Sequence, residues 1–143
     1  MNCSLLEQVY KDASLGYNSC CKLLECLKGK DNKIIGSVEK IRDEYSSFAK
    51  MSRDMLVNSG KTLEDESVIS KMMSSMGILK EVLADNSDTS IAEMLIQGLV
   101  LGEVEMEKRI KTASDDVSKD DLKVAKDFFK FQKSAEKELR KYL

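Results

Sequence analysis

Glu103 is the carboxylate whose position most strongly suggests chemistry in this chain. It stands between Leu99 and Met106 in a series of apolar residues spaced three to four apart, so on a helix it faces the interior. An ionised carboxylate is costly there unless a partner neutralises it or hydrogen-bonds to it. It is therefore either a metal ligand in a helical bundle or, as we favour, an internal glutamate satisfied by a hydroxyl or a lysine. The candidate hydroxyls are those of Tyr10, Tyr17 and Tyr45.

The absence of histidine argues against a di-iron centre. Bundles with such a centre use one glutamate on each of two helices and a Glu-x-x-His pair on each of the other two. This chain has no histidine. Glu39 is followed at the third position by Arg42, and Lys133 stands three positions before Glu136, so cations occupy the places of ligands. We therefore expect no di-iron centre, no cofactor and no catalytic residue.

A site made of carboxylates alone is the remaining metal hypothesis. Beside Glu103, Asp12 and Glu136 are the weak candidate ligands. Calcium or magnesium would need six or more oxygen ligands, some of them water. We assign no metal ligand from the sequence, and convergence of these three carboxylates within ligand distance would favour the metal hypothesis.

The four cysteines lie on or directly before the first predicted helix and match no known cysteine site. Cys20 and Cys21 point about 100° apart on a helix, and the spacing of Cys20 and Cys26 fits neither a disulfide nor a CxxC metal motif. Cys3 is the fourth. Without a histidine base, a thiol enzyme is not expected. Free thiols in a reducing cytoplasm fit best, so we predict a cytoplasmic protein that is not an enzyme.

The composition excludes several other classes. The chain has 143 residues, which predicts a single helical-bundle domain over residues 1–143. Its 23 basic and 25 acidic residues give a formal net charge of -2, without the basic excess of a nucleic-acid-binding protein. The longest apolar run, Met94–Leu101, is too short to span a membrane. Glu7, Lys11 and Asp12 interrupt any apolar core of a signal peptide.

The chain contains no proline, and its apolar residues recur at helical spacing almost throughout. Ser4 is the expected N-cap of the first helix, Asp88 or Ser90 that of the fourth, and Ser118 with Asp121 resembles a capping box before the fifth. The predicted helices are Ser4–Lys28, Asp31–Val57, Leu63–Ala84, Thr89–Ala113 and Ser118–Tyr142.

Four of these helices are long and nearly equal, and short connections join the first two and the last two. This predicts two antiparallel hairpins in an all-α, ferritin-like four-helix bundle, with a helical crossover between the second and third long helices. The shorter segment, Leu63–Ala84, would be that crossover. An up-down array of five helices is the alternative.

Two short motifs carry a family resemblance. Lys11-Asp12 is followed by Gly16-Tyr17, and Gly102-Glu103 is followed by the stretch from Lys108 to Ala113. With these motifs, the chain from Leu5 to Leu143 resembles a small bacterial ferritin-like four-helix-bundle family of unknown function. The resemblance implies the fold, a bacterial cytoplasmic setting and self-association, and it implies no activity.

The predicted crossover carries an apolar stripe, which is too large to leave in water as one patch. Its residues are Met72, Met76, Leu79 and Leu83. The stripe packs either on the bundle or on a second subunit, and we predict the second, as the interface of a homodimer. The expected function is therefore non-enzymatic and depends on self-assembly or partner contacts. The alternative is metal-ion binding, storage or detoxification by bundle carboxylates around Glu103.

Overall fold

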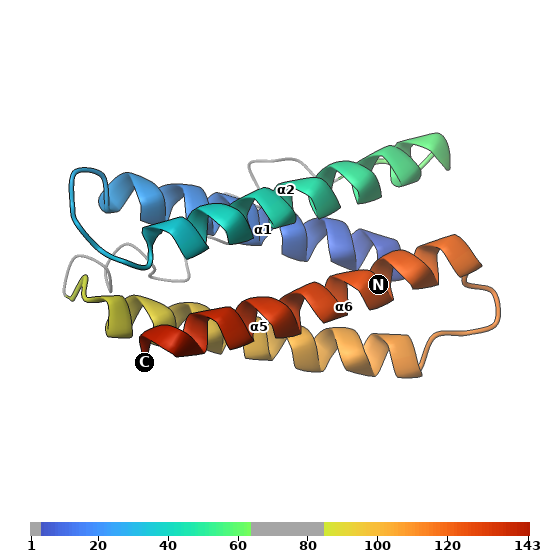
Figure 1. Ribbon diagram of the computed structural model, residues 1–143. Coiled ribbons are helices and arrows are strands. Elements are labelled where there is room, and N and C mark those ends of the chain that lie inside the picture. Colours follow the sequence, from blue (N-terminus) through green and yellow to red (C-terminus); the bar gives the residue numbers. More distant parts are fainter. Residues whose placement is uncertain (1–3, 64–84) are drawn as a thin grey trace.

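The computed structural model describes residues 4–63 and 85–143, and within these ranges the regular elements are all helices, without a strand (Figure 1). The elements are α1 (Leu5–Cys26), α2 (Ile35–Asn58), α5 (Asp88–Lys111), α6 (Lys119–Leu139) and a short 3-10 helix, η1 (Arg140–Tyr142). Apart from Leu63, the predicted crossover helix Leu63–Ala84 lies outside the described residues, as do Cys3 and the predicted interface of Met72, Met76, Leu79 and Leu83.

Serine side chains begin three of the helices. Ser4 and Glu7 form a reciprocal capping box at α1, with the Glu7 N–H donating to Ser4 Oγ at 3.1 Å. Ser118 accepts from the Asp121 N–H at 3.1 Å at the start of α6. The prediction that Asp88 or Ser90 caps α5 is wrong, because Ser87 caps it. A serine oxygen at this position satisfies a backbone N–H that has no partner within the helix.

The second helix begins four residues later than the sequence predicted. The predicted start was Asp31, whereas α2 begins at Ile35, and Ile34 at its N-cap position makes no side-chain cap. The reason is a contact from α5: the Asp88 carboxylate accepts from the Lys33 N–H at 3.1 Å and from Asn32 Nδ2 at 2.9 Å. The first helix ends at Cys26 rather than at the predicted Lys28.

The helices form two antiparallel hairpins, α1 with α2 and α5 with α6 (Figure 1). Tyr142 lies at the start of both α2 and α5: its hydroxyl is 2.7 Å from Ser37 Oγ, and its carbonyl accepts from Thr89 Oγ1 at 3.1 Å. At the opposite end, Lys61 Nζ lies 3.8 Å from the Glu7 carboxylate, next to the start of α1. Helix α2 therefore ends at the end of the bundle opposite to the one where α5 begins.

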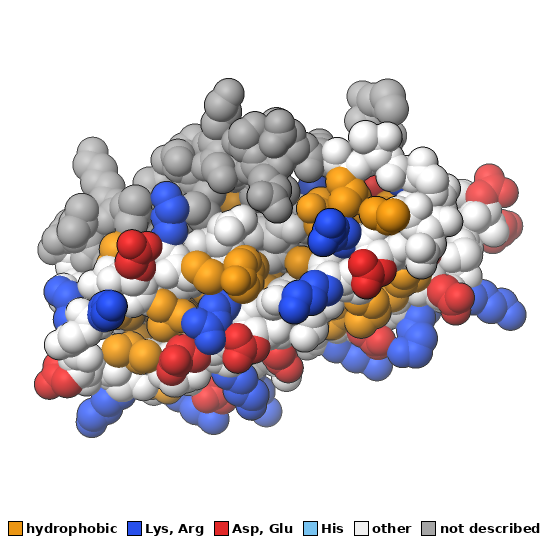
Figure 2. All heavy atoms as spheres, turned by 90° about the horizontal axis from the view of Figure 1, so that it is seen from above, with side chains coloured by type: hydrophobic (Ala, Val, Ile, Leu, Met, Phe, Trp, Pro, Cys, Tyr) orange, Lys and Arg blue, Asp and Glu red, His pale blue; other side chains and the backbone are white. Residues whose placement is uncertain are grey.

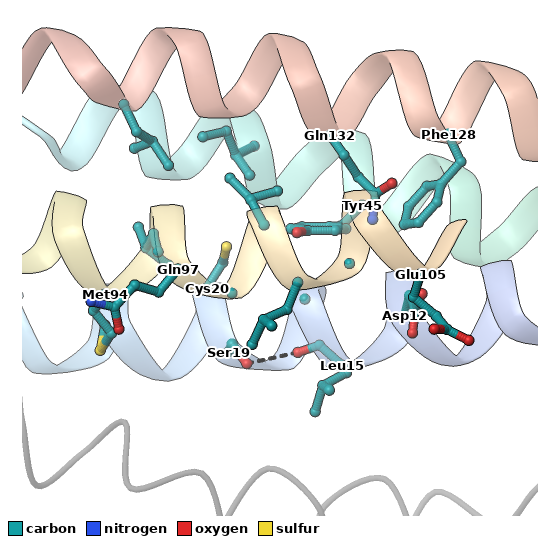
Figure 3. Close-up of a pocket in the computed structure, with 18 residues that line it drawn as sticks. Asp12, Leu15, Ser19, Cys20, Tyr45, Met94, Gln97, Glu105, Phe128 and Gln132 are labelled. Carbon is teal, nitrogen blue, oxygen red and sulfur yellow. Dashed lines mark hydrogen bonds between the residues drawn. The ribbon is translucent and has the colours of Figure 1, made fainter. Parts of the chain in front are cut away.

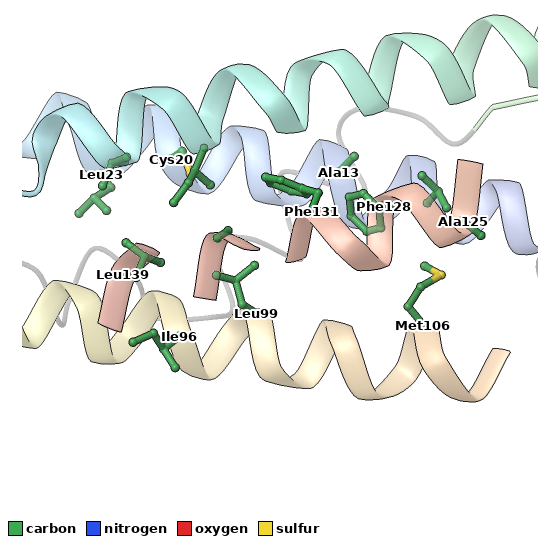
Figure 4. Packing of buried hydrophobic residues seen from close by; sticks show 14 of the residues in the cluster. Ala13, Cys20, Leu23, Ile96, Leu99, Met106, Ala125, Phe128, Phe131 and Leu139 are labelled. Atoms are coloured by element: carbon green, nitrogen blue, oxygen red, sulfur yellow. The ribbon is translucent and has the colours of Figure 1, made fainter. Parts of the chain in front are cut away.

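All four long helices contribute to one hydrophobic core (Figure 4). Its centre is a group of aromatic rings from α2 and α6. Tyr45 meets Phe131 edge-on with ring centroids 4.9 Å apart, and Phe48 meets Phe128 edge-on at 5.2 Å. Edge-to-face pairs at these distances stabilise beyond the area they bury. They fix α6 against α2 and thereby set the positions of the polar residues that α6 carries.

Candidate functional site

Glu103 faces the interior as predicted, and only 8% of its surface is exposed. Its hydrogen-bond partner is the carboxyl of Glu136 on α6, not the tyrosine hydroxyl or lysine ammonium that the sequence suggested. Two carboxyl groups can share a hydrogen bond only if one of them holds a proton. Below the pKa of Glu103, the two carboxyl groups therefore form an acid pair with one shared proton.

The surroundings decide which residue of the pair holds the proton. Burial, followed by the contact with Glu136, raises the pKa of Glu103 to about 7. The pKa of Glu136 is lowered by the hydrogen bond from Glu103 and by Arg140, whose Nε lies 2.8 Å from Glu136 Oε2. Glu103 is thus the protonated member below neutral pH. Its Oε2 is buried and has no hydrogen-bond partner.

Asp12, the third candidate ligand, lies in different surroundings. Its carboxylate accepts from Gln8 Nε2 at 2.8 Å, and the charges that act on it come from Arg109, Glu105 and Lys11. Burial raises its pKa to about 6. Two of the three sequence candidates are therefore brought together and the third stands apart. In the described ranges, no group of three histidine, cysteine, aspartate or glutamate side chains is placed to hold a metal ion.

A cavity of about 460 Å³ lies between α1 and α5, two long helices that contact each other little (Figure 3). Apolar side chains form most of its wall, among them Leu15, Met94 and Leu95. Asp12 and Glu105 lie together at one end of it, as Figure 3 shows. Small-molecule sites are mostly apolar cavities of this size with a few polar groups. The sequence did not indicate this cavity, because it results from the spacing of two helices that are far apart in the chain.

Two glycines allow large side chains to approach the cavity wall. A Cβ on Gly16 would lie 2.4 Å from the Tyr45 ring, so this glycine makes room for the tyrosine. A Cβ on Gly102 would lie 2.7 Å from Nε2 of Gln132. Gln132 is only 2% exposed, and its Oε1 has no hydrogen-bond partner. A buried amide oxygen in that state is uncommon and costs free energy.

In the described ranges, Cys20, Cys21 and Cys26 form no disulfide. Cys20 is almost completely buried, and burial raises its pKa to about 12. A thiol with so high a pKa is not a nucleophile at neutral pH, since the thiolate is the reactive form.

The outer face of α5 carries apolar side chains that the sequence analysis did not assign to any role. Leu101 is 74% exposed, Val104 is 54% exposed and Val100 is 36% exposed. The face of the molecule in Figure 2 has a more usual surface, with positive and negative side chains interspersed and hydrophobic groups in small patches. No helix of the described part of the chain is both long enough and apolar enough to cross a membrane.

None of the protein-family models, curated proteins or solved structures compared with this chain matches it. The geometry of the chain's own residues is therefore the basis for a functional proposal.

Proposed function

We propose that this protein is a non-catalytic, ferritin-like bundle without a di-iron centre, and that it acts by self-association as a homodimer. The exposed apolar stripe on α5 carries the proposal. The proposal also includes a bacterial, cytoplasmic setting, which the family resemblance of the two sequence motifs implies.

The order of the helices supports the ferritin-like assignment. Because α2 ends at the end of the bundle opposite to the start of α5, we propose that the connection between the hairpins is a crossover along the bundle. Helix α5, with 24 residues, is about 36 Å long at 1.5 Å per residue. Two antiparallel hairpins joined by one such crossover are the ferritin-like topology.

The stripe on α5 has the chemistry of a two-fold interface. Its centre is formed by Val100, Leu101 and Val104, all exposed. Glu93 continues it toward the start of the helix and Lys108 toward the end, both also exposed. These five residues lie within about 100° of the helix circumference at 100° per residue. The stripe is thus apolar at its middle and oppositely charged at its two ends.

This distribution fits an antiparallel pairing of α5 with α5 of a second copy. The point midway between Val100 and Leu101 is equally far along the helix from Glu93 and from Lys108. A two-fold axis through that point places Val100 opposite Leu101 of the partner subunit and Glu93 opposite Lys108 of the partner subunit. One self-complementary face then serves both chains, with two ion pairs flanking the apolar contact.

The first experiment replaces two of the three apolar residues at the middle of the stripe with charged ones. In the double variant Val100→Glu with Val104→Lys, the two new charges stand four residues apart in the order that stabilises a helix, so α5 stays folded. We expect a concentration-dependent dimer for the wild type in sedimentation velocity and a folded monomer for the variant. The small area implies weak association, so the measurement covers a wide concentration range. A wild type that is monomeric at every concentration would refute the proposal.

The second experiment tests the antiparallel register. Glu93→Lys and Lys108→Glu each place like charges opposite each other in the dimer, and we expect each to weaken it. The combination of both substitutions restores opposite charges and should restore the dimer. Recovery in the combined variant is specific to this pairing, whereas a further loss would show that the two residues do not meet.

A further inference from the structure

We propose that the cavity between α1 and α5 is a binding site for a small amphipathic amine. In this site the ammonium group lies against the Asp12 carboxylate and the apolar part of the ligand lies between the two helices. This proposal goes beyond self-association and does not depend on it.

The shape and lining of the cavity fit an apolar molecular body. Its volume of about 460 Å³ lies within the usual range for small-molecule sites. Leu15 and Met94 line it from opposite helices, and the Tyr45 and Phe128 rings contribute to its wall. Gly98 also lines it, and a Cβ on this residue would have no atom within 4 Å. The backbone of α5 is therefore directly accessible to an occupant at that point.

The polar side chains on the wall include the amides of Gln97 and Gln132, which can donate and accept, and groups that can only accept from an occupant. Gln132 Oε1 is buried and has no partner. The Ser19 hydroxyl donates to the Leu15 carbonyl at 2.8 Å, which leaves only its lone pairs for an occupant. Asp12 adds a carboxylate. An ammonium group offers three donors and no acceptor, which suits the Asp12 carboxylate.

The charges at the acidic end favour Asp12 as the site of the ammonium. Glu105 is the other carboxylate there, but it already accepts from Arg109 Nε at 3.0 Å. Arg109 and Lys11 also lower the pKa of Asp12, and Glu105 raises it. Burial outweighs these influences, so the pKa rises to about 6. The neighbouring cations therefore compensate only part of the free-energy cost of burying the ionised Asp12 carboxylate. A bound cation would offset the remainder.

The test uses three probes with the same apolar chain and different head groups: n-octylammonium, 1-octanol and octanoate. Binding is measured by isothermal titration calorimetry at about pH 8, where the Asp12 carboxylate and the ammonium are both ionised. We expect saturable one-to-one binding of n-octylammonium, weaker binding of 1-octanol, and octanoate as the weakest ligand.

Two variants and one control assign the binding to the cavity. Asp12→Asn should weaken n-octylammonium about tenfold, or about 1.4 kcal/mol, and leave 1-octanol unchanged. Gly98→Leu places a bulky side chain on the cavity wall and favours the helix, so it should weaken binding of both probes in a folded protein. The control is Glu107→Gln, which removes an exposed carboxylate of α5 that does not line the cavity. It should change neither affinity.

Three results would overturn the proposal. The first is octanoate binding as tightly as n-octylammonium. The second is an ammonium affinity that Asp12→Asn leaves unchanged. The third is undiminished binding to Gly98→Leu, with circular dichroism confirming that the variant retains its helix content.

Discussion

The substitution Glu103→Gln should stabilise this protein above neutral pH, although it removes a buried hydrogen-bonded carboxyl group. Glutamine has the shape of the protonated side chain and can donate from its amide to the Glu136 carboxylate, as the shared proton does now. It cannot ionise. The variant therefore keeps the hydrogen bond at every pH and never introduces a second negative charge into the pair.

The magnitude follows from the raised pKa. A carboxyl that holds its proton up to about pH 7 in the folded state, but only to its model value of 4.5 when unfolded, makes the folded state less stable as the pH rises through that window. At about 1.4 kcal/mol per pH unit, the loss is at most about 3.5 kcal/mol and is complete above pH 7. The partial solvent access of the pair reduces it, so we expect about 1–2 kcal/mol.

Urea unfolding followed by far-ultraviolet circular dichroism, at several values between about pH 4 and pH 8, measures this effect. The stabilities of Glu103→Gln and wild type should agree at the acidic end and diverge as the pH rises. Glu107→Gln, on the exposed side of α5, is the control and should show no such divergence. If Glu103→Gln were less stable than wild type at about pH 8, Glu103 would be ionised and well compensated, and the shared proton would be excluded.

Three further predictions concern the helices and Asp12. Gly16→Ala should destabilise the protein by about 1–3 kcal/mol, because the new Cβ would overlap the Tyr45 ring. Gly98→Ala should stabilise it by up to about 1 kcal/mol, because the new Cβ meets open space. Thermal unfolding of the two variants checks both predictions. Ser4→Ala should cost about 1 kcal/mol in urea unfolding through loss of the capping box, and restoration by Ser4→Asp would confirm that cause. Because the pKa of Asp12 is raised, its ionisation lowers the wild-type free energy of unfolding as the pH rises from about 4 to about 6. Asp12→Asn should remove this decrease, and an unchanged dependence of stability on pH would contradict the raised pKa.

The sequence predicted the elements well because the information for them is local. Apolar spacing identified four helices within a few residues of their ends, and Ser4 was correctly identified as a cap. The inward position of Glu103 also followed from spacing alone. These features depend on residues within one or two helical turns of each other, which the sequence displays directly.

Features that depend on contacts between helices were not predicted. The identity of Glu136 as the partner of Glu103 depends on the register of α5 against α6, and hydrophobic periodicity does not specify that register. The cavity and the isolation of Asp12 depend on the distance between α1 and α5. The delayed start of α2 depends on Asp88, more than 50 residues away in the chain. Periodicity determines which face of a helix is buried, but not which residue of another helix it meets.

The contact of Asp88 with the start of α2 has a consequence for the order of folding. Each hairpin is closed by a short connection, so its contacts are local and can form early. The backbone donors at the start of α2 include those of Lys33 and Ile34, and they find the Asp88 carboxylate only once the second hairpin has arrived. Association of the hairpins and completion of this helix end are therefore a single late event. The first turn of α2 should be the part of that hairpin least formed in the folding transition state, and its amide hydrogens should exchange with solvent whenever the two hairpins separate.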